Sequence, residues 1–332
     1  MKAGQALLYF MTVTGLSLFA TQIMTSCTTK KGNNKLAKTL PNLTEEERKK
    51  IEEQKQEIDL GRNMAGRLLA LYGVYDDIKL RDYVNQVGVY VAGYSDFPER
   101  RYMFQVLNSD SVNAFACPGG YILITLGALR NAKNEAELAA VLGHEVAHVG
   151  KKHMYNTLKK MDKKALAEAE KVTKGKGSEV LNVRRRPEPK DDAATAFAAR
   201  YLSTGSVALN ILGAAKAGMG VILDKGLGPE LEYEADMHGV RYAVRAGYDP
   251  QALSDYLCRI KKKKYGGKCL QKEVKKGGKK TILDKTHPPL HARVTKIQKV
   301  LKDMDAHEIV GAKGTVRYKK FLKDLPVVKS KS

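Results

Sequence analysis

Two histidines separated by three residues are the side chains in this sequence best placed to do chemistry together. His144 and His148 belong to the string HEVAH, residues 144–148. Four residues make about one turn of an α-helix, so both imidazoles lie on one face and can bind a single ion. Glu145 is rotated by about 100° from His144, so it can hold a metal-bound water without being a ligand. These are the groups that a zinc hydrolase requires.

The surroundings of HEVAH favour a catalytic site over a chance occurrence. The chain has seven histidines among 332 residues, and chance gives such a string in about one chain in a hundred. Good helix formers precede the string, and the apolar ones have helical spacing: Ala136, Leu138, Ala139, Val141 and Leu142. We therefore predict a metal-binding helix within residues 134–153 and one zinc ion per chain.

A second helix is expected to supply the third ligand, because a catalytic zinc usually has three protein ligands and one water. Residues 230–245, ELEYEADMHGVRYAVR, are predicted to form a helix on which Glu232 and Asp236 share a face. Ala235 is small enough to let this helix approach the first. We predict Glu232 as the ligand and Asp236 as the acceptor of the second N–H of a ligand histidine. The alternative is a solvated acidic helix start, which the helix dipole favours by itself.

Two further segments are candidates for a role at the site. His287 precedes two prolines, so it either caps the following helix or lies at the cleft mouth. There it would steady the oxyanion or fill the open zinc position at rest. Strands are predicted at 101–107 and 121–126. A peptide substrate is expected to add as an extended strand to Tyr121–Thr125 or to an edge made by Asn113, Ala114, Phe115 and Ala116.

The N-terminus has the features of an export signal. Residues 1–27 contain Lys2, an apolar run from Ala6 to Ala20, and Met24-Thr25-Ser26 before Cys27. Small residues before a cysteine resemble the lipobox of bacterial lipoproteins, although leucine is usual where this chain has Met24. We expect Cys27 to be lipidated; the alternatives are an ordinary cleaved signal and a retained anchor. Residues 28–43 are polar and Lys-rich and are expected to form a flexible tether.

Length and composition indicate one large domain, residues 44–300, with a basic insertion at about 159–200 and a basic C-terminal tail, 301–332. The net charge of +22 favours anionic surfaces. No nucleic-acid module with interleaved aromatic residues is present, so we expect a membrane surface as partner, or simply a solvated Lys-rich coat. Cys258 and Cys269 are either a disulfide pair, in an oxidising compartment, or two unpaired thiols.

Four motifs in a fixed order make the chain similar to a known family. VNAFACPGGYILITLGAL, HEVAH, GPELEYEAD and THPPLHAR resemble the CAAX prenyl protease/HtpX-type zinc metallopeptidases, which are gluzincins, over residues 57–293. The best match is to the periplasmic lipoprotein branch of Gram-negative bacteria. The resemblance implies His144, His148 and Glu232 as zinc ligands, with Glu145 as general base and Asp236 behind the ligands. It also implies an α+β, mostly α-helical, zincin-like fold with a small β-sheet at the active-site cleft.

The resemblance further implies proteolysis in envelope quality control, with unfolded or outer-membrane proteins as substrates. We expect a periplasm-facing lipoprotein, at the outer membrane rather than the inner. The most apolar run outside the signal, Gly205–Leu223, contains Asn210 and Lys216, which favour a buried helix beside the active site over a membrane span. The rival interpretation is a non-proteolytic, zinc-stabilised chaperone or assembly lipoprotein. Glu145 argues against it, because a structural zinc needs no base.

Overall fold

The computed structural model describes residues 43–160, 226–265, 268–270, 287–305 and 309–323. The expected export signal with Cys27, nearly all of the tether and insertion, and the apolar run at 205–223 lie outside these residues. The chain divides into two compact units, residues 1–51 and 52–332. Among the described residues, no helix combines the length and the apolar character needed to cross a membrane.

The described part of the first unit is the beginning of helix α2 (Glu45–Tyr72). The Thr44 amide donates to Glu47 Oε2 at 2.8 Å, and the Glu47 amide donates to Thr44 Oγ1 at 3.2 Å. This reciprocal pair satisfies amides that the first helical turn leaves without partners. A capping box therefore begins α2.

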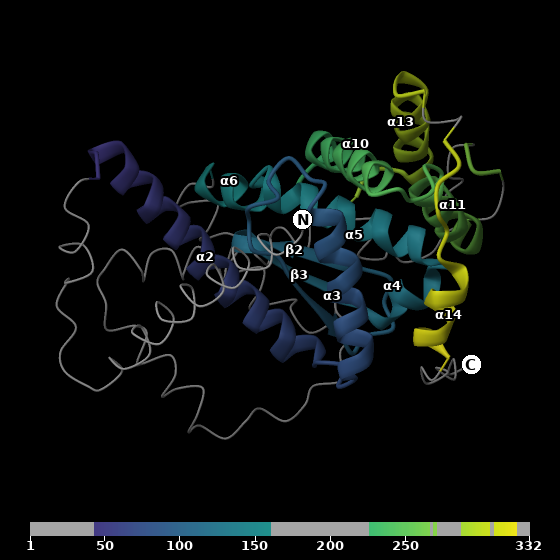
Figure 1. Cartoon of the computed structure of the whole chain (residues 1–332), viewed down its shortest axis with the longest axis horizontal. Helices are drawn as coiled ribbons and strands as arrows, with labels where there is room; N and C mark the ends of the chain where they lie inside the picture. The colour runs from purple at the N-terminus through teal and green to yellow at the C-terminus, as the bar shows by residue number, and fades with distance from the viewer. Residues whose placement is uncertain (1–42, 161–225, 266–267, 271–286, 306–308, 324–332) are drawn as a thin grey trace, which may run out of the picture. The chain divides into compact units, whose positions relative to one another are not determined.

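The second unit is mostly helical, with one small sheet (Figure 1). This arrangement confirms the predicted α+β class. After the remainder of α2, the described helices are α3 (Ile78–Ala92), α4 (Leu126–Asn131), α5 (Glu135–Gly150), α6 (His153–Lys160), α10 (Pro229–Arg245), α11 (Ala252–Tyr265), α13 (Leu290–Asp303) and α14 (Thr315–Leu322).

The sheet has three strands: β1 (Met103–Leu107), β2 (Ala114–Cys117) and β3 (Tyr121–Thr125), in the order β1-β3-β2. β1 runs parallel to β3, and β2 runs antiparallel to it. The turn between β2 and β3 needs glycine, because Gly119 has a φ of 72° and Gly120 a φ of 101°. Since β3 is the central strand, the alternative that it forms a substrate edge is wrong. Within the described chain, β2 is an edge strand.

Residues of the sheet alternate between two hydrophobic clusters, as the period of a strand requires. Ile122 and Ile124 pack in the larger cluster with residues of α3 and α5. Leu123, between them, packs in a smaller cluster with Met64 and Leu68 of α2. Four apolar residues of α3 recur at helical spacing and are all buried: Leu80, Val84, Val87 and Val91. The sheet is thus covered on both faces, and α5 is held deep in the second unit.

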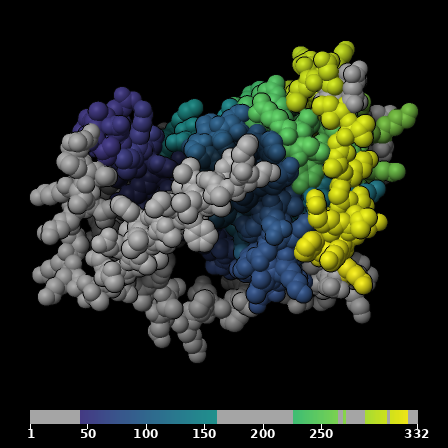
Figure 2. All heavy atoms as spheres, in the orientation of Figure 1, coloured from purple at the N-terminus to yellow at the C-terminus, as the bar shows by residue number. Residues whose placement is uncertain are grey.

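The chain beyond α13 is folded onto this core rather than free. The Ala136 amide at the start of α5 donates to the Lys313 carbonyl at 3.1 Å. On α14, the Tyr318 hydroxyl donates to the Leu129 carbonyl at 2.6 Å, and the Phe321 ring stacks on Tyr83 with 4.0 Å between centroids. Figure 2 shows this segment in yellow against α3 in blue. The described part of the expected C-terminal tail is therefore part of the domain.

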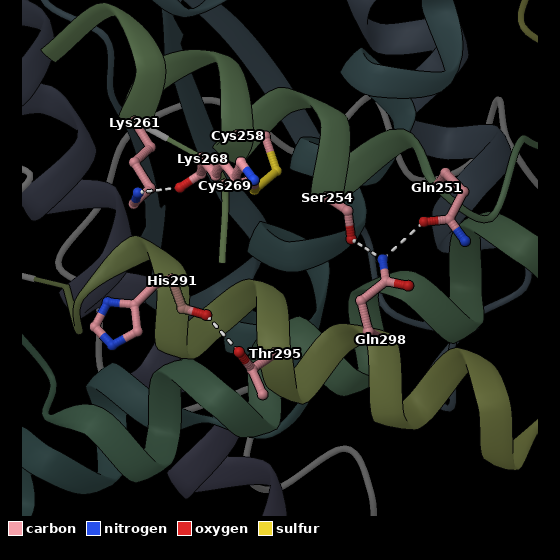
Figure 3. The surroundings of a disulfide bond; sticks show 9 residues. All are labelled: Gln251, Ser254, Cys258, Lys261, Lys268, Cys269, His291, Thr295 and Gln298. Carbon is pink, nitrogen blue, oxygen red and sulfur yellow. Dashed lines mark hydrogen bonds between the residues drawn. A yellow bond between two sulfur atoms is a disulfide. The ribbon is translucent and has the colours of Figure 1, made fainter. Parts of the chain in front are cut away.

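A disulfide joins α11 to the segment that follows it (Figure 3). Cys258 and Cys269 are paired, with 5.1 Å between their Cα atoms. Beside them, the Gln298 amide of α13 donates to Gln251 Oε1 at 2.7 Å and to Ser254 Oγ at 2.9 Å. The disulfide and these hydrogen bonds together tie α11 to its neighbours.

Candidate active site

The HEVAH sequence lies on α5, which is buried along its whole length. The helix begins at Asn134, whose side chain accepts from the Glu137 amide at 2.9 Å. His144 and His148 are 4% and 5% exposed, and their Nε2 atoms lie 3.1 Å apart. The spacing of four residues thus brings the two ring nitrogens to one point, as the sequence predicts.

Helix α10 packs against α5 (Figure 1). The closest approach is between two glycines: a Cβ on Gly239 would lie 2.5 Å from the His144 amide nitrogen, and one on Gly143 2.8 Å from the Gly239 carbonyl oxygen. Ala235, expected to allow the approach, is fully buried, but the glycines make the tightest contact. Their missing side chains let the two helices present their polar groups to each other.

Glu232 of α10 meets both histidines. Its Oε2 lies 3.6 Å from His144 Nε2, and its Oε1 lies 3.6 Å from His148 Nε2. Donors around a tetrahedral zinc with bonds of about 2.0–2.1 Å are separated by about 3.3 Å. The observed separations of 3.1–3.6 Å match such a donor set. Glu232 is only 3% exposed, so it is not a solvated residue at a helix start.

The burial and the charge of these donor atoms favour a bound cation. Glu232 Oε2 is buried and has no hydrogen-bond partner, which is costly for a carboxylate oxygen unless an ion binds it. Burial by itself lowers the pKa of His144, but the Asp236 and Glu232 carboxylates raise it to about 9. The negative charge of Asp236 and Glu232 that stabilises this proton also attracts a metal cation, which would take the place of the proton on His144. The residues therefore fit the zinc that the sequence predicts.

His287 brings a further nitrogen to the same point. Its Nε2 lies 3.3 Å from Glu232 Oε2, and it shares with His144 and Glu232 a group of ligand atoms that all lie within 4.8 Å of one another. Helix α13 begins at Leu290 with Pro289 as its N-cap, so the alternative that His287 caps this helix is wrong. His287 instead faces the ligand atoms of Glu232 and His144, as the other alternative predicts.

Asp236 lies behind His144, one helical turn after Glu232. Its Oδ1 is 2.9 Å from His144 Nδ1, the position expected for a group that orients a ligand histidine. Arg293 of α13 donates to both Asp236 oxygens, from Nε at 2.8 Å and from Nη2 at 2.6 Å. Burial opposes the charge of Asp236, but Arg293 lowers the pKa of this carboxyl to about 2. The sequence alone indicates no role for Arg293, although this residue ends the motif THPPLHAR.

Glu145 has the environment of a proton acceptor that works near neutral pH. It is 7% exposed, and burial raises the pKa of its carboxyl to about 7 even though His144 opposes the shift. A general base is most efficient when its pKa lies near the working pH.

Edge strand β2, which contains Ala114, Phe115 and Ala116, packs against α5, the helix that carries Glu145. Asn113 immediately precedes the strand and is 8% exposed.

The sequence matches the model of peptidase family M48 over residues 79–301. The beta-barrel assembly-enhancing protease of Escherichia coli (strain K12) is 25% identical over 205 residues, covering 62% of this chain and 37% of that protein. The protein of the same name in Yersinia pestis is 28% identical over 187 residues, covering 56% and 34%. The mitochondrial metalloendopeptidase OMA1 of Arabidopsis thaliana is 27% identical over 167 residues, covering 46% and 27%. The match thus spans about a third of the length of these relatives.

Proposed function

The chain belongs to peptidase family M48, and we propose that it is a zinc-dependent endopeptidase of the bacterial envelope that cleaves unfolded or misassembled proteins. Membership of the family confirms the expectation of a peptide-hydrolysing metalloenzyme; the CAAX protease/HtpX-type enzymes of the sequence-based resemblance are a sibling branch. The observation that carries the proposal is the meeting of His144, His148 and Glu232 at separations of 3.1–3.6 Å.

In this mechanism His144, His148 and Glu232 would hold one zinc ion. When bound, zinc would supply Lewis acidity for the scissile carbonyl and for a water, whose pKa would fall to about 7. Glu145 accepts the proton of the attacking water and returns it to the leaving amine. Asp236 keeps His144 oriented, and Arg293 keeps Asp236 charged through its two hydrogen bonds.

The substrate is proposed to bind as an extended strand along β2. Edge strands offer unpaired amides and carbonyls to an added peptide, and β2 pairs with β3 alone within the described chain. Because β2 lies against α5, a peptide along its free edge passes close to Glu145. Recognition through the main chain requires an unfolded segment but little sequence specificity, which suits misassembled proteins as substrates.

The envelope location is proposed from the N-terminal sequence and from the relatives. The proteins from Escherichia coli and Yersinia pestis are named for β-barrel assembly, which supports outer-membrane protein substrates. Lipidation at Cys27 together with the basic surface would hold the enzyme at the membrane facing the periplasm. Membrane fractionation tests this: Cys27→Ala should move to the soluble fraction, and unchanged tight membrane association would contradict the anchor.

Glu145→Gln tests the enzymatic part of the proposal. The amide keeps the size of the side chain but cannot accept a proton at neutral pH, and the three proposed ligands are unchanged. We expect about one equivalent of zinc to remain while hydrolysis of unfolded casein falls by about 10²-fold or more. Unfolded envelope proteins should remain bound to the variant, because β2 is unaltered.

Glu232→Gln is the matched control, because a neutral amide is a poor zinc ligand and metal and activity should be lost together. If Glu145→Gln digests unfolded protein as fast as the parent, the peptidase mechanism is wrong. If parent and variant both bind unfolded protein and neither cleaves it, the chaperone interpretation takes its place.

A further inference from the structure

The turn after α5 places a third histidine directly behind one of the proposed ligands. α5 ends at Gly150 and α6 begins at His153. Lys152 lies between them, and its φ of 57° is in the left-handed region that residues other than glycine rarely adopt. His153 directly follows this turn. It is 4% exposed, and its Nδ1 lies 2.9 Å from His148 Nδ1.

A buried carboxylate of α2 holds this turn. Glu57 is 1% exposed, and its Oε2 lies 3.0 Å from Lys152 Nζ. Its Oε1 lies 2.8 Å from Arg100 Nη1 and accepts from the Gly119 amide at 3.3 Å. Unfavourable backbone conformations persist where the surroundings over-determine them, and they concentrate at functional sites. The ion pair to Lys152 is one such constraint on the turn that precedes His153.

The contact between the two Nδ1 atoms requires one ring to donate and the other to accept. His148 Nε2 faces the donor group, 3.1 Å from His144 Nε2, and it must keep its lone pair to bind a metal. A neutral His148 therefore carries its hydrogen on Nδ1 and donates it to His153 Nδ1. His153 then carries its own hydrogen on Nε2, which faces Glu234 Oε2 at 3.4 Å.

We propose that His153 is a positioning residue of the metal site, which holds His148 in the tautomer and ring orientation that present Nε2 to the metal. Metal-binding histidines almost always give their other N–H to a fixed acceptor. Asp236 is that acceptor for His144, at 2.9 Å, and His153, backed by Glu234, is that acceptor for His148. The inference rests on the proposed zinc site and adds a residue that neither HEVAH nor the acidic helix contains.

The test compares His153→Asn with His153→Leu in the full chain. The two replacements have nearly the same shape, but only asparagine places an oxygen where histidine has Nδ1, so only asparagine can accept from His148. Zinc affinity is measured by competition with a chromophoric chelator. We expect His153→Leu to bind zinc about 10–100-fold more weakly than the parent, and His153→Asn to recover most of that loss.

Equal zinc affinity in His153→Leu and the parent would overturn the inference. Equal weakening by both replacements would also overturn it, since the loss would then come from packing and not from the hydrogen bond. The melting temperature of each metal-free variant reports folding, and His153→Phe replaces His153→Leu if the latter does not fold. A parent chain that binds no zinc would instead refute the proposed function itself.

Discussion

At the scale of single residues, His287 gives the site more donors than catalysis needs. A catalytic zinc keeps one position for water, yet His287 Nε2 lies 3.3 Å from Glu232 Oε2, in the same group of ligand atoms as His144. Burial lowers the pKa of His287 to about 4, so the ring is neutral at pH 7 and can bind a metal. We infer that His287 occupies the position of the water when no substrate is bound.

His287→Ala should therefore leave zinc content at one equivalent, because three proposed ligands remain. Turnover of an unfolded substrate should rise, because His287 no longer competes with the water for its position. If that competing contact is worth about 1.4 kcal/mol, the rise is about tenfold. Zinc content and initial rates on casein measure the two quantities. A tenfold fall in turnover would instead assign His287 to stabilising the oxyanion, and an unchanged rate would leave it a structural role.

The residues of the site differ in how far the sequence identifies them. His144 and His148 follow from one helical repeat, and Glu232 and Asp236 follow from a second, because each pair shares a face of its own helix. Arg293 reaches Asp236 from another helix altogether, so no local spacing indicates the pair. The sequence includes His153 in the predicted helical stretch 134–153, whereas α5 ends at Gly150. The contact of His153 with His148 lies beyond the left-handed Lys152, and a lysine does not signal such a turn.

At the scale of elements, the site depends on how closely α10 approaches α5. Gly239→Ala would place a Cβ 2.5 Å from the His144 amide nitrogen, against backbone that cannot move aside easily. We expect the helices to separate, with a loss of about 1–3 kcal/mol of stability as in other overpacked cores. Zinc should also bind more weakly, because Glu232 moves away from His144 and His148. Urea unfolding and chelator competition measure the two effects.

Gly66→Ala is the control for this substitution. Gly66 lies on α2, and a Cβ there would meet nothing within 4 Å. Alanine should stabilise that helix by up to about 1 kcal/mol and leave zinc affinity unchanged. A Gly239→Ala variant with the zinc affinity of the parent would show that the separation of α5 and α10 is not critical to the site.

Most of the helices and strands can be predicted from the spacing of apolar residues, but which of them pack or pair together cannot. The helical spacing of Leu80, Val84, Val87 and Val91 indicates α3, and all four residues are buried in the structure. The strand pattern of Tyr121–Thr125 also predicts β3. That β3 is central and β2 an edge depends on which strands pair, and pairing is decided by contacts between segments rather than by the pattern within one.

At the scale of the whole molecule, Glu135 joins distant parts of the chain at the start of α5. The Tyr83 hydroxyl of α3 donates to it at 2.6 Å, and the Tyr248 hydroxyl, beyond α10, donates at 2.9 Å. Arg317 of α14 completes the cluster with an ion pair. α14 lies beyond the part of the chain that matches the family, residues 79–301. The sequence showed only a basic tail there, because the partner of Arg317 is 182 residues away.

Glu135 should make the stability of the fold depend on acid. Burial by itself raises its pKa, but hydrogen bonds from Arg317, Tyr83 and Tyr248 outweigh it and hold the pKa below the ordinary value. Since the unfolded chain takes up this proton first, at about pH 4.3, the stabilisation is complete above that pH. It is lost as pH falls through the pKa that Glu135 has in the folded chain.

Glu135→Gln should therefore lower the free energy of unfolding at pH 7, and the difference from the parent should shrink below about pH 4.3. Urea unfolding across this range measures the difference, with the exposed Glu99→Gln as control. A difference that stays constant with pH would show that the charge of Glu135 does not tie these elements together.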